Sequence, residues 1–164
     1  MFVDISAGDS ILLIDKSSER ILRRASELVR RAGDFQERPM KIRFGGAAGP
    51  IAFERMRRMH NGSWEMITVP MGLALRTSSL LEPLAAPGCA LVEERFRQFG
   101  GGRPDATDGN GSRNAAESPG RSMALLAEAD VPDIDFDRAE QKFVLRKNLL
   151  DAPYFTKLWK IELG

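Results

Sequence analysis

The sequence predicts an α/β fold of three layers, in which helices cover both faces of a central parallel sheet and one further helix is added at the C-terminus. Two observations favour this class. Short apolar runs alternate with segments whose apolar residues recur at helical spacing. The chain has 164 residues, which is long enough to bury a core without disulfides or metals.

The first elements follow from local signals. Ile11–Asp15 is an apolar run that ends in an acid, as a buried parallel strand would. Ser17–Ser18 can cap a following helix with one apolar stripe, and Gly33 supplies its end. A second apolar stretch, Met40–Phe44, predicts another strand.

Residues 51–69 allow two interpretations. Apolar side chains at helical spacing predict a helix over residues 52–60, which Asn61-Gly62 would end. The same Asn-Gly pair can instead form the type I′ turn of a hairpin, which would pair Met59 with Trp64. The helix is preferred because residues 52–60 contain no Val, Ile, Thr, Tyr or Trp.

The remaining elements are predicted from the same patterns. Asp137 with Glu140 resembles a capping box that opens a helix. We expect strands at Met66–Val69, Cys89–Glu93 and Val131–Phe136, and helices around Leu75–Leu84, at Ser122–Ala129, from Asp137 to Leu150 and over the C-terminal YFTKLWKIEL.

Residues 100–122 divide the chain. This segment, GGGRPDATDGNGSRNAAESPGRS, contains no Val, Ile, Leu, Met or aromatic residue, so burial cannot offset the entropy of ordering it. It predicts a flexible linker or insertion. Residues 1–99 then form the main part of a single α/β domain, and residues 123–164 supply a C-terminal strand and helices that complete it.

Composition narrows the function classes. The net charge of +1 does not by itself predict a polyanionic partner. Cys89 is the single cysteine and cannot form an internal disulfide, which suggests a reducing compartment. The N-terminal residues match neither a secretory signal nor a membrane span. We therefore expect a cytoplasmic protein with no membrane partner.

Two stretches carry a family resemblance. ILLIDKSSERILRRASELVRRAG resembles the first strand and helix of response-regulator receiver domains, and FERMRRMHNGSWEMITVPMG is similar to their second helix and third strand. The resemblance implies the flavodoxin-like, receiver-like order of parallel strands. Receivers bind Mg²⁺ through clustered carboxylates and phosphorylate an Asp that ends their third strand. Here Lys16 follows Asp15, and Thr-Val-Pro at residues 68–70 replaces that Asp. The resemblance thus implies a degenerate receiver that keeps its fold as a protein-binding platform.

Few residues are candidates for catalysis. His60 is the only histidine and stands at the expected helix end, where it would cap the last carbonyls or lie at the surface. Two glutamates, Glu93 and Glu94, stand a few residues after Cys89, and their charge does not favour a thiolate. The acids at positions 133, 135 and 137 do not continue into a calcium loop. We expect no catalytic residue, no metal and no cofactor.

A phosphate site is possible at GGAAGP, between an expected strand and an expected helix. Backbone N–H groups there can bind an anion through Gly45, Gly46 and Gly49. The stretch lacks both the G-x-G-x-x-G spacing and a G-K-[ST] ending, so a plain tight turn is the alternative.

Two sets of side chains are candidates for partner binding. The expected C-terminal helix would bind a protein partner or a second copy if it exposed its aromatic stripe, which includes Tyr154, Phe155, Leu158 and Trp159. Arginines on two expected helices can contact nucleic-acid phosphates, namely Arg23, Arg24, Arg30, Arg31, Arg55, Arg57 and Arg58.

The sequence therefore favours a non-enzymatic cytoplasmic regulatory or adaptor protein that acts through protein–protein contacts. The alternatives are a regulator that binds nucleic acid through its arginines and an enzyme that binds a phosphate ligand at the GGAAGP turn.

Overall fold

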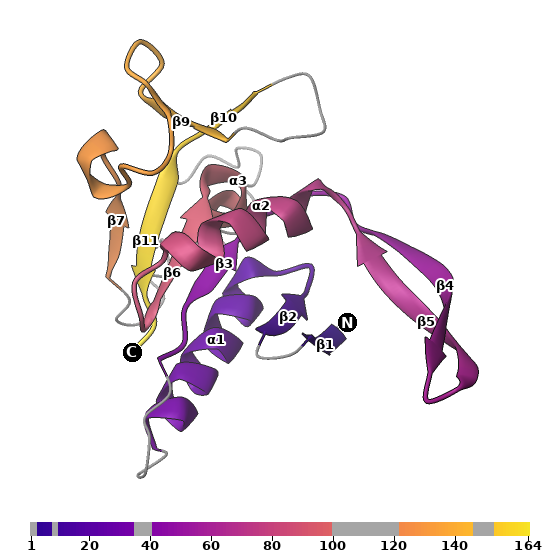
Figure 1. Ribbon diagram of the computed structural model, residues 1–164. Coiled ribbons are helices and arrows are strands. Elements are labelled where there is room, and N and C mark those ends of the chain that lie inside the picture. Colours follow the sequence, from indigo (N-terminus) through magenta and orange to yellow (C-terminus); the bar gives the residue numbers. More distant parts are fainter. Residues whose placement is uncertain (1–2, 8–9, 35–40, 100–121, 146–152) are drawn as a thin grey trace, which may run out of the picture.

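The computed structural model describes residues 3–7, 10–34, 41–99, 122–145 and 153–164, and it shows a mixed fold rich in strands (Figure 1). The strands in this part of the chain are β1 (Val3–Ala7), β2 (Ser10–Ile14), β3 (Phe44–Gly46), β4 (Ala52–His60), β5 (Ser63–Met71), β6 (Cys89–Glu93), β7 (Met123–Leu125), β8 (Phe136–Asp137), β9 (Lys142–Leu145), β10 (Tyr154–Thr156) and β11 (Leu158–Glu162). The helices are α1 (Ser18–Gly33), α2 (Leu73–Leu81) and α3 (Glu94–Gln98), with 3₁₀ turns η1 (Glu82–Leu84) and η2 (Glu128–Asp130).

The predicted central parallel sheet is wrong. The largest sheet has four strands in the order β3-β6-β11-β7, and only β3 and β6 run parallel. β11 runs antiparallel to both of its neighbours, and β2 pairs antiparallel with β1 rather than entering this sheet. An apolar run predicts that a strand is buried but does not give its direction, because direction depends on which distant strand it pairs with.

The two faces of the four-stranded sheet bury two separate cores. Side chains alternate along β6, so Leu91 enters one core and Val92 the other. The first core also receives Leu81 from α2 and Phe143 from β9. The second core receives Ala25 from α1. Because β11 comes after residue 122, strands from both sides of the predicted linker share this sheet. Residues 100–121 of that linker lie outside the described residues.

Elements with strong local signals were predicted correctly. Ser17 is the N-cap of α1, and its hydroxyl accepts a hydrogen bond of 3.3 Å from the Arg20 N–H. α1 ends at Gly33 as expected. The predicted strand at Cys89–Glu93 is β6, and α2 with η1 covers the predicted helix around Leu75–Leu84.

Three predicted helices are wrong. Residues 52–60 form β4, the C-terminal YFTKLWKIEL forms β10 and β11, and Ser122–Ala129 contains β7 and the start of η2. The C-terminal segment is strand because β11 pairs with β6 and β7, and these distant contacts override its local helical spacing.

The region after η2 also differs from the prediction. Of the strand expected at Val131–Phe136, only Phe136 lies in a strand, β8. Asp137 does act as a cap, since its Oδ1 accepts hydrogen bonds from the backbone N–H groups of Ala139 and Glu140. It caps a turn rather than a helix, and the chain then enters β9. Residues 146–150 of the predicted helix lie outside the described residues.

None of the helices in the described ranges is both long enough and apolar enough to cross a membrane.

Candidate functional site

The most distinctive feature is a long hairpin, β4–β5, which we call the arm (residues 52–71). It projects away from the rest of the molecule (Figure 1). Its strands pair from Ala52–Met71 to His60–Ser63. The connecting residues Asn61 and Gly62 both have positive φ, 50° and 77°, which is the type I′ geometry of a two-residue hairpin turn. The arm is the hairpin that the sequence left as the alternative.

The arm exposes many large apolar side chains. Trp64, Met66 and Met59 are 65%, 61% and 58% exposed, respectively. Phe53, Met56 and Met71 are each about half exposed. All residues of β4 are exposed and none of β5 is buried. A monomeric protein rarely exposes so many large apolar side chains on one element, and such exposure usually marks an interaction site.

The two faces of the arm differ in charge. Residues directly opposite each other in the hairpin share a face. One face, which we call the basic face, carries two arginines and no acidic residue; it consists of Phe53, Arg55, Arg57, Met59, Trp64, Met66, Thr68 and Pro70. The other face carries Glu54, Arg58 and Glu65 among its apolar side chains. The basic face is therefore both apolar and cationic.

His60 lies beside the turn of the arm and not at the end of a helix. Its side chain is half exposed, and its Nδ1 is 3.5 Å from Glu65 Oε1. Cys89 is buried in β6. Within the described residues, no three His, Cys, Asp or Glu side chains gather in a way that could hold a metal ion.

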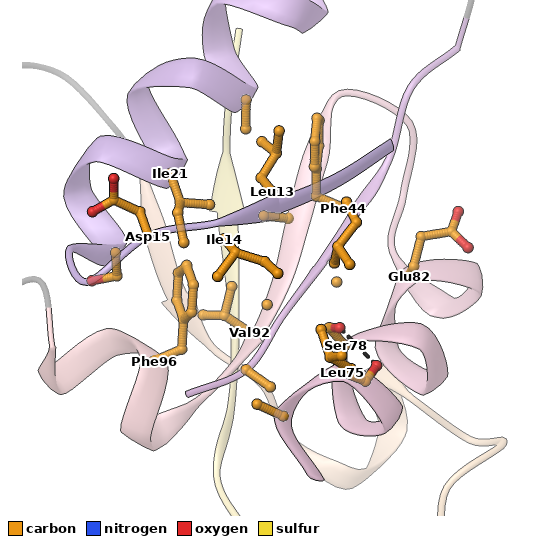
Figure 2. A pocket seen from close by; sticks show the side chains of 18 of the residues that line it. Leu13, Ile14, Asp15, Ile21, Phe44, Leu75, Ser78, Glu82, Val92 and Phe96 are labelled. Carbon is orange, nitrogen blue, oxygen red and sulfur yellow. Dashed lines mark hydrogen bonds between the residues drawn. The ribbon is translucent and has the colours of Figure 1, made fainter. Parts of the chain in front are cut away.

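A second feature is an apolar cavity of about 1650 Å³, which we call the cleft, between β2, α1, β3 and α2 (Figure 2). Leu13, Ile14 and Ile21 line it on one side, with Phe44 and Phe96 among the side chains that complete it. Its lining is therefore largely hydrocarbon, which favours apolar ligands over charged ones.

The two carboxylates that line the cleft each pair with an arginine. Asp15 Oδ1 is 2.6 Å from Arg20 Nη2, and Glu82 Oε1 is 2.6 Å from Arg43 Nε. Phe53 at the base of the arm also lines the cleft. The apolar surface of the cleft thus continues onto the arm.

The three glycines of GGAAGP lie where helix α2 approaches β3. A Cβ atom on Gly45 would lie 1.9 Å from the carbonyl oxygen of Ser78, and one on Gly46 would lie 2.7 Å from a methyl group of Val92. A Cβ on Gly49 would touch that of Ala74 at 3.5 Å. These glycines allow close packing of α2 and β6 against this segment.

An internal carboxylate already binds the GGAAGP turn. The N–H of Ala48 donates a hydrogen bond of 2.8 Å to Glu93 Oε1, and Glu93 is only 2% exposed. A phosphate at this turn would meet the negative charge of Glu93, which opposes anion binding. Phosphate binding at Gly45, Gly46 and Gly49 remains a prediction, and no contact in the structure favours it.

The C-terminal aromatic residues take part in internal contacts. Burial, together with the nearby Glu93 carboxylate, raises the pKa of Tyr154 to about 12. The indole N–H of Trp159 donates to Glu94, and the Arg97 guanidinium lies 4.4 Å from the centre of the Trp159 ring. Leu158 is fully buried, whereas Phe155 is 42% exposed. The four residues therefore do not form one exposed stripe.

Glu94 provides a pH-dependent contact in this cluster. A hydrogen bond from Arg97 holds the pKa of Glu94 below its ordinary value of 4.5; burial opposes this shift, and the Trp159 N–H supports it. Because the pKa is lower in the folded state, the Glu94 carboxylate stabilises the fold above pH 4.5, and this stabilisation is lost as pH falls through the lower folded pKa.

We expect Trp159 fluorescence to report this titration. In a Trp64→Phe variant, Trp159 is the only tryptophan, and its emission should change with a midpoint below pH 4.5. Adding Glu94→Gln should abolish the change, while Glu162→Gln, on the same strand as Trp159, should not. A midpoint at or above pH 4.5 would contradict the contact.

The predicted arginines are not brought together. Arg23, Arg24, Arg30 and Arg31 lie on α1 in the body of the molecule, whereas Arg55, Arg57 and Arg58 lie on the arm (Figure 1). Arg24 also pairs with Glu27 at 2.8 Å. Of these seven arginines, Arg55 and Arg57 share a face with the exposed rings of Phe53 and Trp64.

The arm as a binding element was missed by sequence reasoning. The usable signals were Asn61-Gly62, which favours a two-residue hairpin, and Pro70, which a buried central strand would not tolerate. Comparison of this chain with protein-family models, with curated proteins and with solved structures found no match. The receiver resemblance therefore remains a prediction.

Proposed function

We propose that this protein is a non-enzymatic regulatory or adaptor protein that acts by binding another protein chain through its arm. The observation that carries the proposal is the exposure of apolar side chains along the whole length of β4 and β5. We place the protein in the cytoplasm, an assignment that its single cysteine supports.

The arm is poorly suited to stand alone in water. A two-stranded hairpin is only marginally stable without a third strand or a packed face; among the described residues no third strand pairs with the arm, and no residue of β4 or β5 is buried. Tryptophan, methionine and arginine, which it exposes on its basic face, are enriched in protein–protein interfaces. Binding a partner would bury these side chains and stabilise the hairpin.

The basic face supports a second candidate, binding of nucleic acid. Arg55 and Arg57 can contact phosphates, and the exposed ring of Trp64 can stack on a base. If this candidate is correct, affinity for single-stranded oligonucleotides falls steeply as salt increases, and Arg55→Ala with Arg57→Ala reduces the salt dependence. Absence of binding at low ionic strength would exclude it.

We expect a shortened arm to abolish partner binding without unfolding the body. Deleting residues 55–58 and 65–68 removes four facing pairs, so it keeps both the Asn61-Gly62 turn and the alternation of the remaining pairs. The two cores contain no arm residue, so the melting temperature should change by less than about 3 °C.

Photo-crosslinking identifies the partner of the full-length chain, and a pull-down of that partner with the full-length and the shortened chain measures its loss. A photoreactive amino acid at position 66 of the full-length chain should crosslink to a protein in the native host. The same group at position 138, which is well exposed but far from the arm in sequence, serves as the control. Equal crosslinking from both positions, or none from position 66, would contradict the proposed function.

A further inference from the structure

We infer that the arm binds a second copy of this chain: the free edge of β5 pairs antiparallel with β5 of the second copy, giving a four-stranded sheet with a two-fold axis. This inference rests on the proposed function and names its partner. It follows from which backbone groups the arm leaves free and from the charges beside them.

The hairpin register determines which amides face outward. A two-residue turn makes the closing pair, His60 and Ser63, a hydrogen-bonded pair, and such pairs alternate with non-hydrogen-bonded ones along the ladder. On β5, the outward N–H groups therefore belong to Trp64, Met66 and Thr68. Pro70 occupies the next outward position, where its missing N–H costs the arm no internal hydrogen bond.

The two free edges differ in their protection against pairing. The outward positions of β4 include Arg55 and Arg57, whereas none of those of β5 is charged. If β4 paired with its own copy about an axis at residue 55, 56 or 57, two arginines would stand directly opposite each other. Charged edge residues are the usual means by which proteins prevent such pairing. The β5 edge lacks them.

One register gives every outward N–H group of the β5 edge a carbonyl partner. With Met66 opposite Met66 of the second copy, Trp64 stands opposite Thr68, and all three outward N–H groups of each chain meet a carbonyl. In this register Glu65 faces Ile67, so no like charges are opposed, and Pro70 falls opposite Gly62, beyond the paired segment.

The neighbouring registers are less favourable. Centring the axis on Ile67 places Pro70 opposite Trp64, whose carbonyl then lacks a donor. Centring it on Glu65 places the two Glu65 carboxylates opposite each other, which is destabilising. The sequence of β5 thus selects the Met66-centred register.

The test is the oligomeric state of the full-length chain, measured by analytical ultracentrifugation over a range of concentrations. We expect a monomer–dimer equilibrium. Met66→Lys and Met66→Glu should each weaken the dimer at least about tenfold, because each places like charges on the two-fold axis. An equimolar mixture of the two variants should restore the dimer, since residue 66 faces itself only in this register.

Two matched pairs of variants test whether the effect is specific to the β5 edge. Met59→Lys introduces the same charge at an outward position of β4 and should leave the dimer unchanged within about threefold, because that edge stays free. Met66→Pro removes the outward donor and should weaken the dimer at least about tenfold, whereas Met59→Pro should not. Circular dichroism establishes that each variant is folded.

The outcomes separate this inference from the proposed function. A chain that stays monomeric at all concentrations, or a dimer that Met66→Lys leaves unchanged, overturns the inference. If that monomer still crosslinks through position 66 to a different protein, the proposed function stands with another partner. A chain that neither dimerises nor crosslinks contradicts both.

Discussion

Replacing Gly45 with alanine is expected to destabilise the protein by about 3 kcal/mol, which would lower its melting temperature by about 6–12 °C. The added Cβ would lie 1.9 Å from the Ser78 carbonyl oxygen and 2.5 Å from the Glu82 amide nitrogen. Both atoms belong to the backbone of α2 and η1, so relief requires the whole helix to move away from β3. Thermal unfolding followed by circular dichroism measures the change.

Gly33→Ala is the matched control for Gly45→Ala. Gly33 ends α1, and a Cβ there would meet no atom within 4 Å. Its φ is not positive, so alanine fits the backbone and should be neutral or stabilising by up to about 1 kcal/mol. If Gly45→Ala were as mild as Gly33→Ala, α2 would not pack against β3 as described.

The sequence predicted those elements whose signals are local. Ser17 begins α1 because a capping side chain acts within a few residues, and α1 ends at Gly33 as expected, although Gly33 does not adopt a left-handed conformation. β6 was predicted because residues 89–92 are consecutive apolar residues, and such a run is visible in the sequence without knowledge of the neighbouring strands. How β6 pairs with β3 and β11 was not predictable, because those contacts join distant parts of the chain.

The arm was misread because its strands bury neither face. Alternation of apolar and polar residues arises when one face of a strand packs on a core, and β4 is exposed along its whole length. Its Met, Arg and Glu residues are also good helix formers, so local propensity favours the wrong structure. Asn61-Gly62 pointed to the hairpin but can also end a helix, and Pro70 argued only against a buried central strand.

In contrast to the arm, the C-terminal segment does contain the alternation expected of a strand with one buried face. Phe155, Leu158 and Trp159 fit a helical spacing, but Trp159, Ile161 and Leu163 also alternate, and these three belong to the same core. The alternation is the pattern that corresponds to β11. The alternation decides between helix and strand only when β6 and β7 are known to lie on either side of β11.

Leu158→Ala is expected to destabilise the fold by about 3 kcal/mol because it opens a cavity in a core. Leu158 is fully buried and belongs to the same core as Leu91 and Phe143. Its contribution is therefore to stability, whereas the sequence had suggested partner binding. Urea unfolding should show a lower midpoint with an unchanged slope.

Phe155→Ala tests whether the C-terminal segment contributes to stability or to partner binding. Phe155 is 42% exposed and lies on β10, so its removal should cost about 1 kcal/mol or less. Neither variant changes the β5 edge, so at temperatures where both are folded the dimer constant should match that of the parent chain. Equal destabilisation by the two substitutions would contradict the burial of Leu158, and a weakened dimer in folded Phe155→Ala would place the C-terminal segment in the interface after all.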